Sequence, residues 1–225
     1  AFQEVVSDMY DGFLSAEDRQ HIKMPDFEVI APIVKWGNPE DGPYTITIEQ
    51  AMQIKVQNAI VSLPPAIAHG VLVAWSSLAH ETAGQDIAHA DDGLVPEMQA
   101  AVANAIRKDT KIKSAAMKNL LATYWSNCMD ETSADVMGIL NMGPAPAIGM
   151  IPFFRSFLHQ VGRPAKLRNT GPGEDPHPAD ILRVMLGASA VRGLSFAGSG
   201  AWADAILAEG LKDLTSIKLS TTGPL

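Results

Sequence analysis

A chain of 225 residues, 47% hydrophobic and 19% charged, is long enough to fold as one globular domain with a sizeable core. Its 25 acidic and 17 basic residues give a formal net charge of -8, and no run of Lys and Arg exceeds two residues, so it lacks the basic face that nucleic acids or anionic membranes attract. The single cysteine, Cys128, excludes an internal disulfide and a cysteine-based metal site. The longest apolar stretch, residues 70–79, is far shorter than the ~20 residues that span a bilayer. We therefore expect residues 1–225 to form one soluble domain without a nucleic-acid partner or a membrane span. The sequence specifies neither an oligomeric state nor a compartment.

The first half of the chain is predicted to combine helices with a small β element. Residues 1–20 place apolar side chains at helical spacing, whereas residues 26–49 contain two short runs rich in β-branched residues around a Gly/Pro loop. Thr47 is a suitable N-cap for the next helix. The expected elements are a helix over 1–20, strands over 27–30 and 44–48, and helices over 48–63 and 66–90.

The second half is predicted to be helical apart from one long loop. The expected helices cover 96–107, 114–141, 148–161, 178–191 and 199–213. Residues 162–179 are rich in proline and glycine, and a loop of that length in a compact domain is often functional. The predicted fold class is mainly α, with a small β element near the N-terminus.

The first candidate for chemistry is the pair His80-Glu81, on an otherwise apolar segment. In a helical zinc site, a His binds the metal, and a Glu beside it takes a proton from the metal-bound water. The second His of such a site normally lies four residues on, but that position is Gly84 in this chain. Gln85 would reach the face of His80 only through a π-bulge, and its amide oxygen is a poorer zinc ligand than imidazole.

Two further candidates lie downstream. Glu131 and Asp135 are four residues apart, so a helix would project both carboxylates from one face. One of them can then bind a metal while the other orients a liganding imidazole. The third candidate is His177-Pro178 in the long loop, with Asp180 and Arg183 at the start of the next helix.

These three motifs, in this order, resemble the gluzincin metallopeptidases. His80-Glu81 matches the start of the first gluzincin motif, Glu131-x-x-x-Asp135 the second, and His177-Pro178 the third. The resemblance implies a zincin-like helical domain that binds zinc and hydrolyses amide bonds of a peptide or small-molecule substrate. In this resemblance, His80 and Glu131 would be zinc ligands, and Gln85 would be a candidate third ligand. Glu81 would be the general base. Asp135 would orient His80, and His177 would stabilise the oxyanion.

Other interpretations of the same residues stay open at this point. His80-Glu81 can be a buried hydrogen-bonded pair of a helical core, Glu131 and Asp135 can face water or pair with Lys118, and His177-Pro178 can mark a helix start. The chain would then be a degenerate zincin-like domain that binds a partner or ligand without metal. A non-hydrolytic enzyme that uses the His and carboxylates as acid and base is a third hypothesis.

Overall fold

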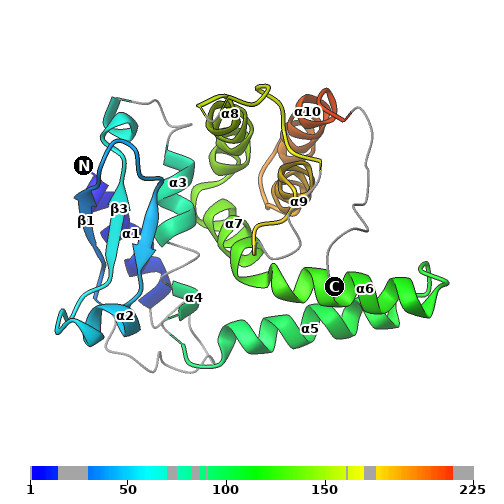
Figure 1. Cartoon of the computed structure of the whole chain (residues 1–225), viewed down its shortest axis with the longest axis horizontal. Helices are drawn as coiled ribbons and strands as arrows, with labels where there is room; N and C mark the ends of the chain where they lie inside the picture. The colour runs from blue at the N-terminus through cyan, green and yellow to red at the C-terminus, as the bar shows by residue number, and fades with distance from the viewer. Residues whose placement is uncertain are drawn as a thin grey trace.

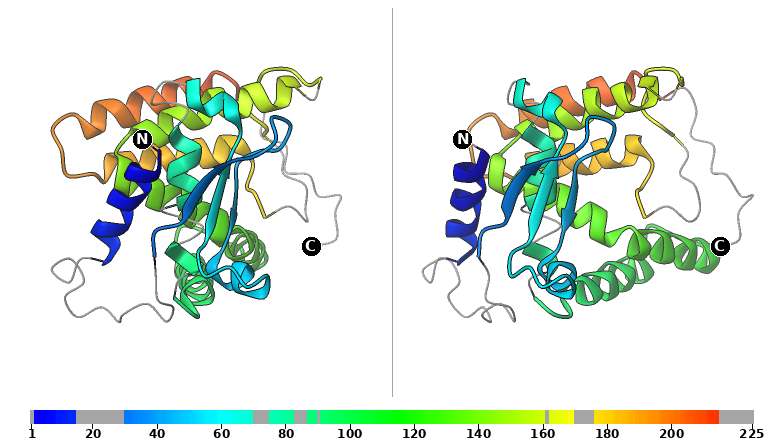
Figure 2. Two further views of the ribbon diagram at one scale, coloured as in Figure 1. Left: turned by 90° about the vertical axis from the view of Figure 1, so that its left-hand side faces the viewer. Right: turned by 60° about the vertical axis from the view of Figure 1, so that its left-hand side comes forward.

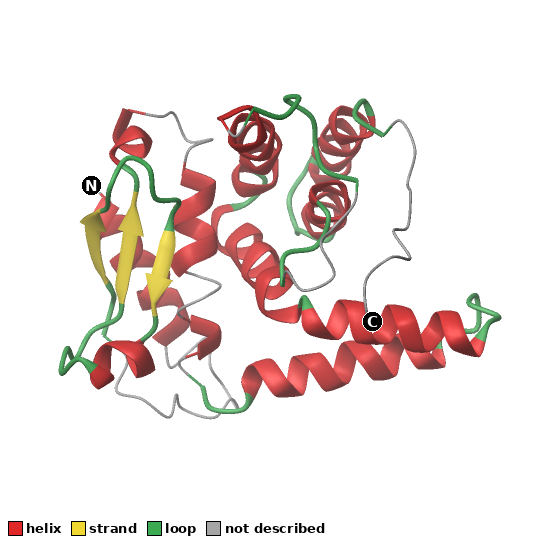
Figure 3. Ribbon diagram, viewed as in Figure 1, coloured by secondary structure: helices red, strands yellow, loops and turns green. Residues whose placement is uncertain are grey.

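The computed structural model is mainly helical, with one small sheet at one side of the molecule (Figures 1 and 3). The predicted fold class, mainly α with a small β element near the N-terminus, is confirmed. The structure describes residues 2–14, 30–69, 75–82, 87–89, 91–160, 162–169 and 176–214. None of the helices in these ranges has the length and hydropathy needed to cross a membrane.

The sheet has three strands, and its central strand was not expected. The strands are β1 (Ile33–Trp36), β2 (Tyr44–Ile46) and β3 (Ile60–Leu63), in the order β1-β3-β2, with β3 parallel to β1 and antiparallel to β2. The predicted helix over 48–63 is wrong beyond its first turns, because α2 (Ile48–Gln53) ends before Lys55, whose φ of 62° is left-handed. Residues 60–63 form β3 instead, where β-branched side chains fill the buried middle of the sheet.

The other predictions for this half hold in part. Helix α1 (Phe2–Leu14) begins as expected, and Thr47 caps α2 through a capping box with Gln50. Of the first predicted strand, residues 27–29 lie outside the described residues, Ile30 is not in a strand, and β1 begins at Ile33. In the predicted helix over 66–90, the described residues form a 3-10 turn (Pro65–His69), α3 (Ser76–Ala79) and α4 (Ile87–His89), while residues 70–74, 83–86 and 90 lie outside the described residues.

All the helices predicted for the second half are present, although one of them is split. They are α5 (Leu94–Lys108), α6 (Ala115–Asn127), α7 (Met129–Met142), α8 (Ala145–Gln160), α9 (Asp180–Arg192) and α10 (Ser199–Leu211). The split occurs at Cys128, which ends α6 and begins α7. Helices α5 and α6 run side by side as an arm that points away from the sheet (Figures 1 and 2).

Close packing of α3 on α7 fixes the geometry of the site described below. Gly138 of α7 faces Ala79 of α3 so closely that a Cβ on Gly138 would lie 3.1 Å from the Ala79 carbonyl carbon. A larger residue at position 138 would therefore separate the two helices. Because Ala79 directly precedes His80, this contact brings His80 beside the polar face of α7.

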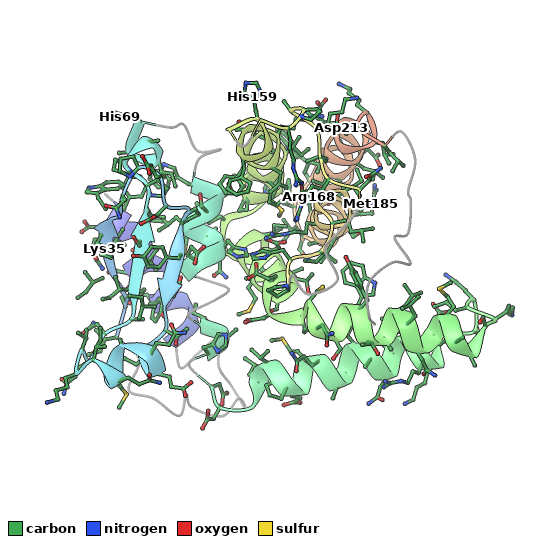
Figure 4. The ribbon with its side chains drawn as sticks, in the orientation of Figure 1. Lys35, His69, His159, Arg168, Met185 and Asp213 are labelled. Carbon is green, nitrogen blue, oxygen red and sulfur yellow. The ribbon has the colours of Figure 1, made fainter. Side chains whose placement is uncertain are left out.

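A partly exposed ion-pair cluster joins α8 to the C-terminal end of α10. Arg155 of α8 donates to Asp213 (2.8 Å) and to Glu209 (2.8 Å), and Asp213 also accepts from the backbone N–H of Leu167 (2.9 Å). Asp213 is labelled in Figure 4 at the end of α10. Desolvation would raise the pKa of Asp213, but the hydrogen bonds from Arg155 and Leu167 outweigh it and lower the pKa below its ordinary value.

We expect Asp213→Asn to lower the free energy of unfolding by roughly 1 kcal/mol near neutral pH, the order of one charge-assisted hydrogen bond at a partly exposed site. A carboxyl with a depressed folded-state pKa stabilises the protein above its unfolded pKa of about 3.9, and this contribution is lost as the pH falls through the folded value. The difference in the free energy of unfolding between variant and wild type, measured with urea, should therefore be smaller at pH 3 than at pH 7. Asp204→Asn, which removes a 72% exposed carboxylate, is the control, and an equal loss there would contradict the assignment.

Candidate functional site

The imidazole of His80 lies between two carboxylates of α7. His80 Nδ1 is 2.9 Å from Asp135 Oδ1, and His80 Nε2 is 3.3 Å from Glu131 Oε2. Burial alone would lower the pKa of His80, but the hydrogen bond to Asp135 and the nearby Glu131 carboxylate outweigh it and raise the pKa to about 10. Carboxylates at both ring nitrogens therefore fix the orientation of the ring and favour its protonated form.

Asp135 is in turn fixed by Arg183 of α9. The guanidinium donates to both carboxylate oxygens, at 2.7 Å each, and stacks over the ring of Phe154 with 4.9 Å between guanidinium carbon and ring centroid. Asp135 and Arg183 are only 3% and 6% exposed. Desolvation opposes the charge on Asp135, but Arg183 and His80 outweigh it and hold the pKa of Asp135 well below its usual range. Arg183 thus favours the ionised form of Asp135, which supports His80.

His177 approaches the other carboxylate from the loop before α9. Its Nε2 lies 3.3 Å from Glu131 Oε2, the same oxygen that faces His80, and its side chain is 44% exposed. Burial would raise the pKa of Glu131, but the contact with His80 and the other nearby positive charges lower it overall. Two imidazoles therefore converge on one ionised carboxylate, one of them buried and one at the opening.

Glu81 is a buried carboxyl beside His80 and Glu131. It is 6% exposed, and its Oε2 accepts a hydrogen bond from the hydroxyl of Thr45 in β2 (2.7 Å). Burial is the main influence on Glu81 and raises its pKa above the ordinary value. A carboxyl with a raised pKa is suited to accept and return protons near neutral pH.

These side chains line one cavity of about 770 Å³, a size typical of small-ligand pockets. Its polar part contains the five residues that the sequence singled out as a group, namely His80, Glu81, Glu131, Asp135 and His177. An apolar wall comes from α8, and Arg163, Arg168 and Arg183 also line the cavity. One of these, Arg168, lies between α8 and α9 in Figure 4.

The donor atoms fit zinc in part. His80 Nε2 and Glu131 Oε2 are 3.3 Å apart, and two ligands of a tetrahedral zinc ion with bonds of about 2.0–2.1 Å are separated by about 3.3 Å. Within the described ranges, however, no group of three or more His, Cys, Asp and Glu side chains has the arrangement needed to hold a metal ion. Gln85, the predicted third donor, and Gly84 lie outside the described residues. The described residues thus supply two donors, and zinc stays a prediction.

One detail of the backbone bears on the missing donor. His80, Glu81 and Thr82 have π-helical conformation. In a π-helical turn the residue five positions on, rather than four, returns to the same face. The sequence-based expectation for a third donor therefore falls on position 85 and not on position 84.

Several of the alternative interpretations can now be judged. Glu131 and Asp135 do not face water or pair with Lys118, whose Nζ donates to the carbonyl of Arg107 instead. His177-Pro178 does directly precede a helix, since α9 begins at Asp180, but His177 also lines the cavity.

Sequence reasoning missed the roles of Arg183 and Thr45 and the apolar wall from α8. Arg183 carried a usable signal, because a charged residue within the apolar run Ile181–Met185 of a helix must find a buried partner. Thr45 carried none, since its partner Glu81 is 36 residues away.

Comparisons with protein-family models, curated proteins and solved structures give no match for this chain.

Proposed function

We propose that the cavity is the centre of a metal-dependent hydrolase of the gluzincin type, which cleaves amide bonds in peptides or small acylated molecules. The observation that carries the proposal is the orientation of His80, with Asp135 at Nδ1 and Glu131 at Nε2. A metal-ligating histidine commonly donates its second ring N–H to a carboxylate, which fixes the ring and increases its basicity. Arg183 holds the Asp135 carboxylate in place by donating to both of its oxygens.

Each polar residue of the cavity would have its own role in hydrolysis. His80 Nε2 and Glu131 would hold zinc, with Gln85 as the predicted third donor, and the ion would act as a Lewis acid toward the substrate carbonyl and lower the pKa of water. Glu81 would accept a proton from the attacking water as the C–O bond forms, and return it to the amide nitrogen as the C–N bond breaks. His177, at the opening, would donate a hydrogen bond to the oxyanion that develops on the carbonyl.

A second candidate function is favoured by the chemistry of position 84 and by the donor count. Gly84 has no side chain to coordinate a metal, and no three-donor cluster occurs in the ranges that the structure describes. The alternative is a degenerate domain that binds a ligand in the same cavity without metal. In that protein the His80 network is a structural ion-pair cluster, and chelators leave its stability unchanged.

The two candidates differ in metal content. We expect protein purified without added metal to contain, or take up on titration, about one zinc per chain by elemental mass spectrometry, and His80→Ala and Glu131→Gln to lose it. Glu81→Gln should retain zinc yet hydrolyse a fluorogenic peptide roughly 10²–10⁴-fold more slowly, the usual contribution of a general base. Glu97→Gln, on the exposed face of α5, is the control for removing one carboxylate. Absence of zinc uptake by the wild type would contradict the hydrolase and support the metal-free domain.

A further inference from the structure

The cavity contains exposed aromatic surface that no described part of the chain covers. Phe153 and Phe157 are four residues apart on α8, with ring centroids 6.5 Å apart and an angle of 17° between the rings. Both line the cavity, and they are 39% and 53% exposed. A ligand that covers them would gain the hydrophobic free energy of aromatic burial, which makes this wall a binding surface for an apolar group.

Among the described residues, the cavity also contains an arginine that pairs with no carboxylate. Arg183 is paired with Asp135, and the Nε of Arg168 donates to Asp180 (2.9 Å). Arg163 is exposed and forms no ion pair with any carboxylate of the described residues. Since His80 and His177 face the ionised Glu131, Arg163 is, among the described residues that line the cavity, the cation best placed to bind an anionic group of a ligand.

Phe153 and Phe157 lie in the C-terminal half of α8, and Arg163 lies just beyond the end of that helix. The helix ends at Gln160, and Gly162, whose φ is 73°, donates its N–H to the carbonyl of His159 (3.0 Å) as the chain turns. Arg163 follows directly and lines the same cavity as Phe153 and Phe157. One ligand can therefore present an apolar group to the rings and an anion to the guanidinium.

We infer that the cavity takes ligands in which an apolar side chain stands beside a free carboxylate, as in the C-terminal residue of a peptide or an acylated apolar amino acid. Arg163 binds the carboxylate through paired N–H donors, which is the strong geometry for this pair. Phe153 and Phe157 bind the apolar side chain. That such ligands are substrates rests on the proposed hydrolase, whereas their binding does not.

The test compares two probes that differ in one charge. Isothermal titration with N-acetyl-phenylalanyl-phenylalanine and with its C-terminal carboxamide uses Glu81→Gln, so that turnover does not interfere. We expect at least about tenfold tighter binding of the carboxylate, which corresponds to about 1.4 kcal/mol. Arg163→Gln in the same background should reduce this ratio to near one. Phe153→Ala with Phe157→Ala should weaken both probes alike.

Arg107→Gln is the matched control, because Arg107 is an exposed arginine of α5 that does not line the cavity. It should leave the tenfold preference unchanged. Three results would each overturn the inference. They are equal binding of the two probes by the Glu81→Gln protein, an unchanged preference after Arg163→Gln, and no binding of either probe. Binding with the expected preference but without zinc or hydrolysis would overturn the proposed hydrolase alone.

Discussion

Replacing Arg183 by Met is expected to destabilise the protein by about 3–5 kcal/mol, the usual cost of removing one partner of a buried ion pair. The cost comes from the carboxylate that is left behind. Asp135 is 3% exposed, and two of its hydrogen bonds, at 2.7 Å each, come from Arg183. Methionine has a similar shape but provides no donor, and it also ends the stacking of the guanidinium on Phe154. Urea unfolding followed by circular dichroism measures the difference.

Arg192→Met is the control for this experiment, because it makes the same substitution on the same helix. Arg192 pairs with Asp204, but the two side chains are 51% and 72% exposed, so we expect a loss of only about 0–1 kcal/mol. The double variant Asp135→Leu, Arg183→Met removes both charges and should regain much of the stability lost in Arg183→Met. A loss below about 1 kcal/mol in Arg183→Met would show that Asp135 is not held as the structure describes.

The parts of the fold that could be predicted are those set by local chemistry. Thr47 caps α2 with a hydrogen bond to a backbone N–H three residues away, and the helices from α5 onward follow the apolar period of their own segments. Strand β3 could not be predicted in this way, because residues 60–63 are apolar enough for either a helix or a strand. Their pairing with β1, some 27 residues earlier, decides the outcome.

The same distinction applies to the site. The spacing of Glu131 and Asp135 predicts two carboxylates on one helical face, and the motif order suggested that His80 and His177 would be near them. The structure places all four around the cavity, while their catalytic roles stay predictions. Two long-range contacts hold these residues in place. Arg183 pairs with Asp135, 48 positions earlier in the chain, and Gly138 of α7 packs on Ala79 of α3, 59 positions earlier. No local sequence pattern encodes either contact.

Installing a histidine at position 85 should strengthen zinc binding, and this gain is the sharpest test of the proposed metal site. A third imidazole would complete the donor set that His80 and Glu131 begin. Partners that only orient a metal ligand already change affinity by about 10–100-fold, so we expect Gln85→His to increase zinc affinity at least tenfold. Competition with a fluorescent chelator measures the dissociation constant.

The matched control is Gly84→His, which adds the same imidazole one residue earlier. The π-helical conformation of residues 80–82 favours a spacing of five, so Gly84→His should gain little. Combining Gln85→His with His80→Ala should remove the gain, because both imidazoles would bind the same ion. A larger gain at position 84 would mean that an α-helical spacing governs the site. No gain at either position would argue that His80 and Glu131 form an ion-pair cluster in a metal-free domain.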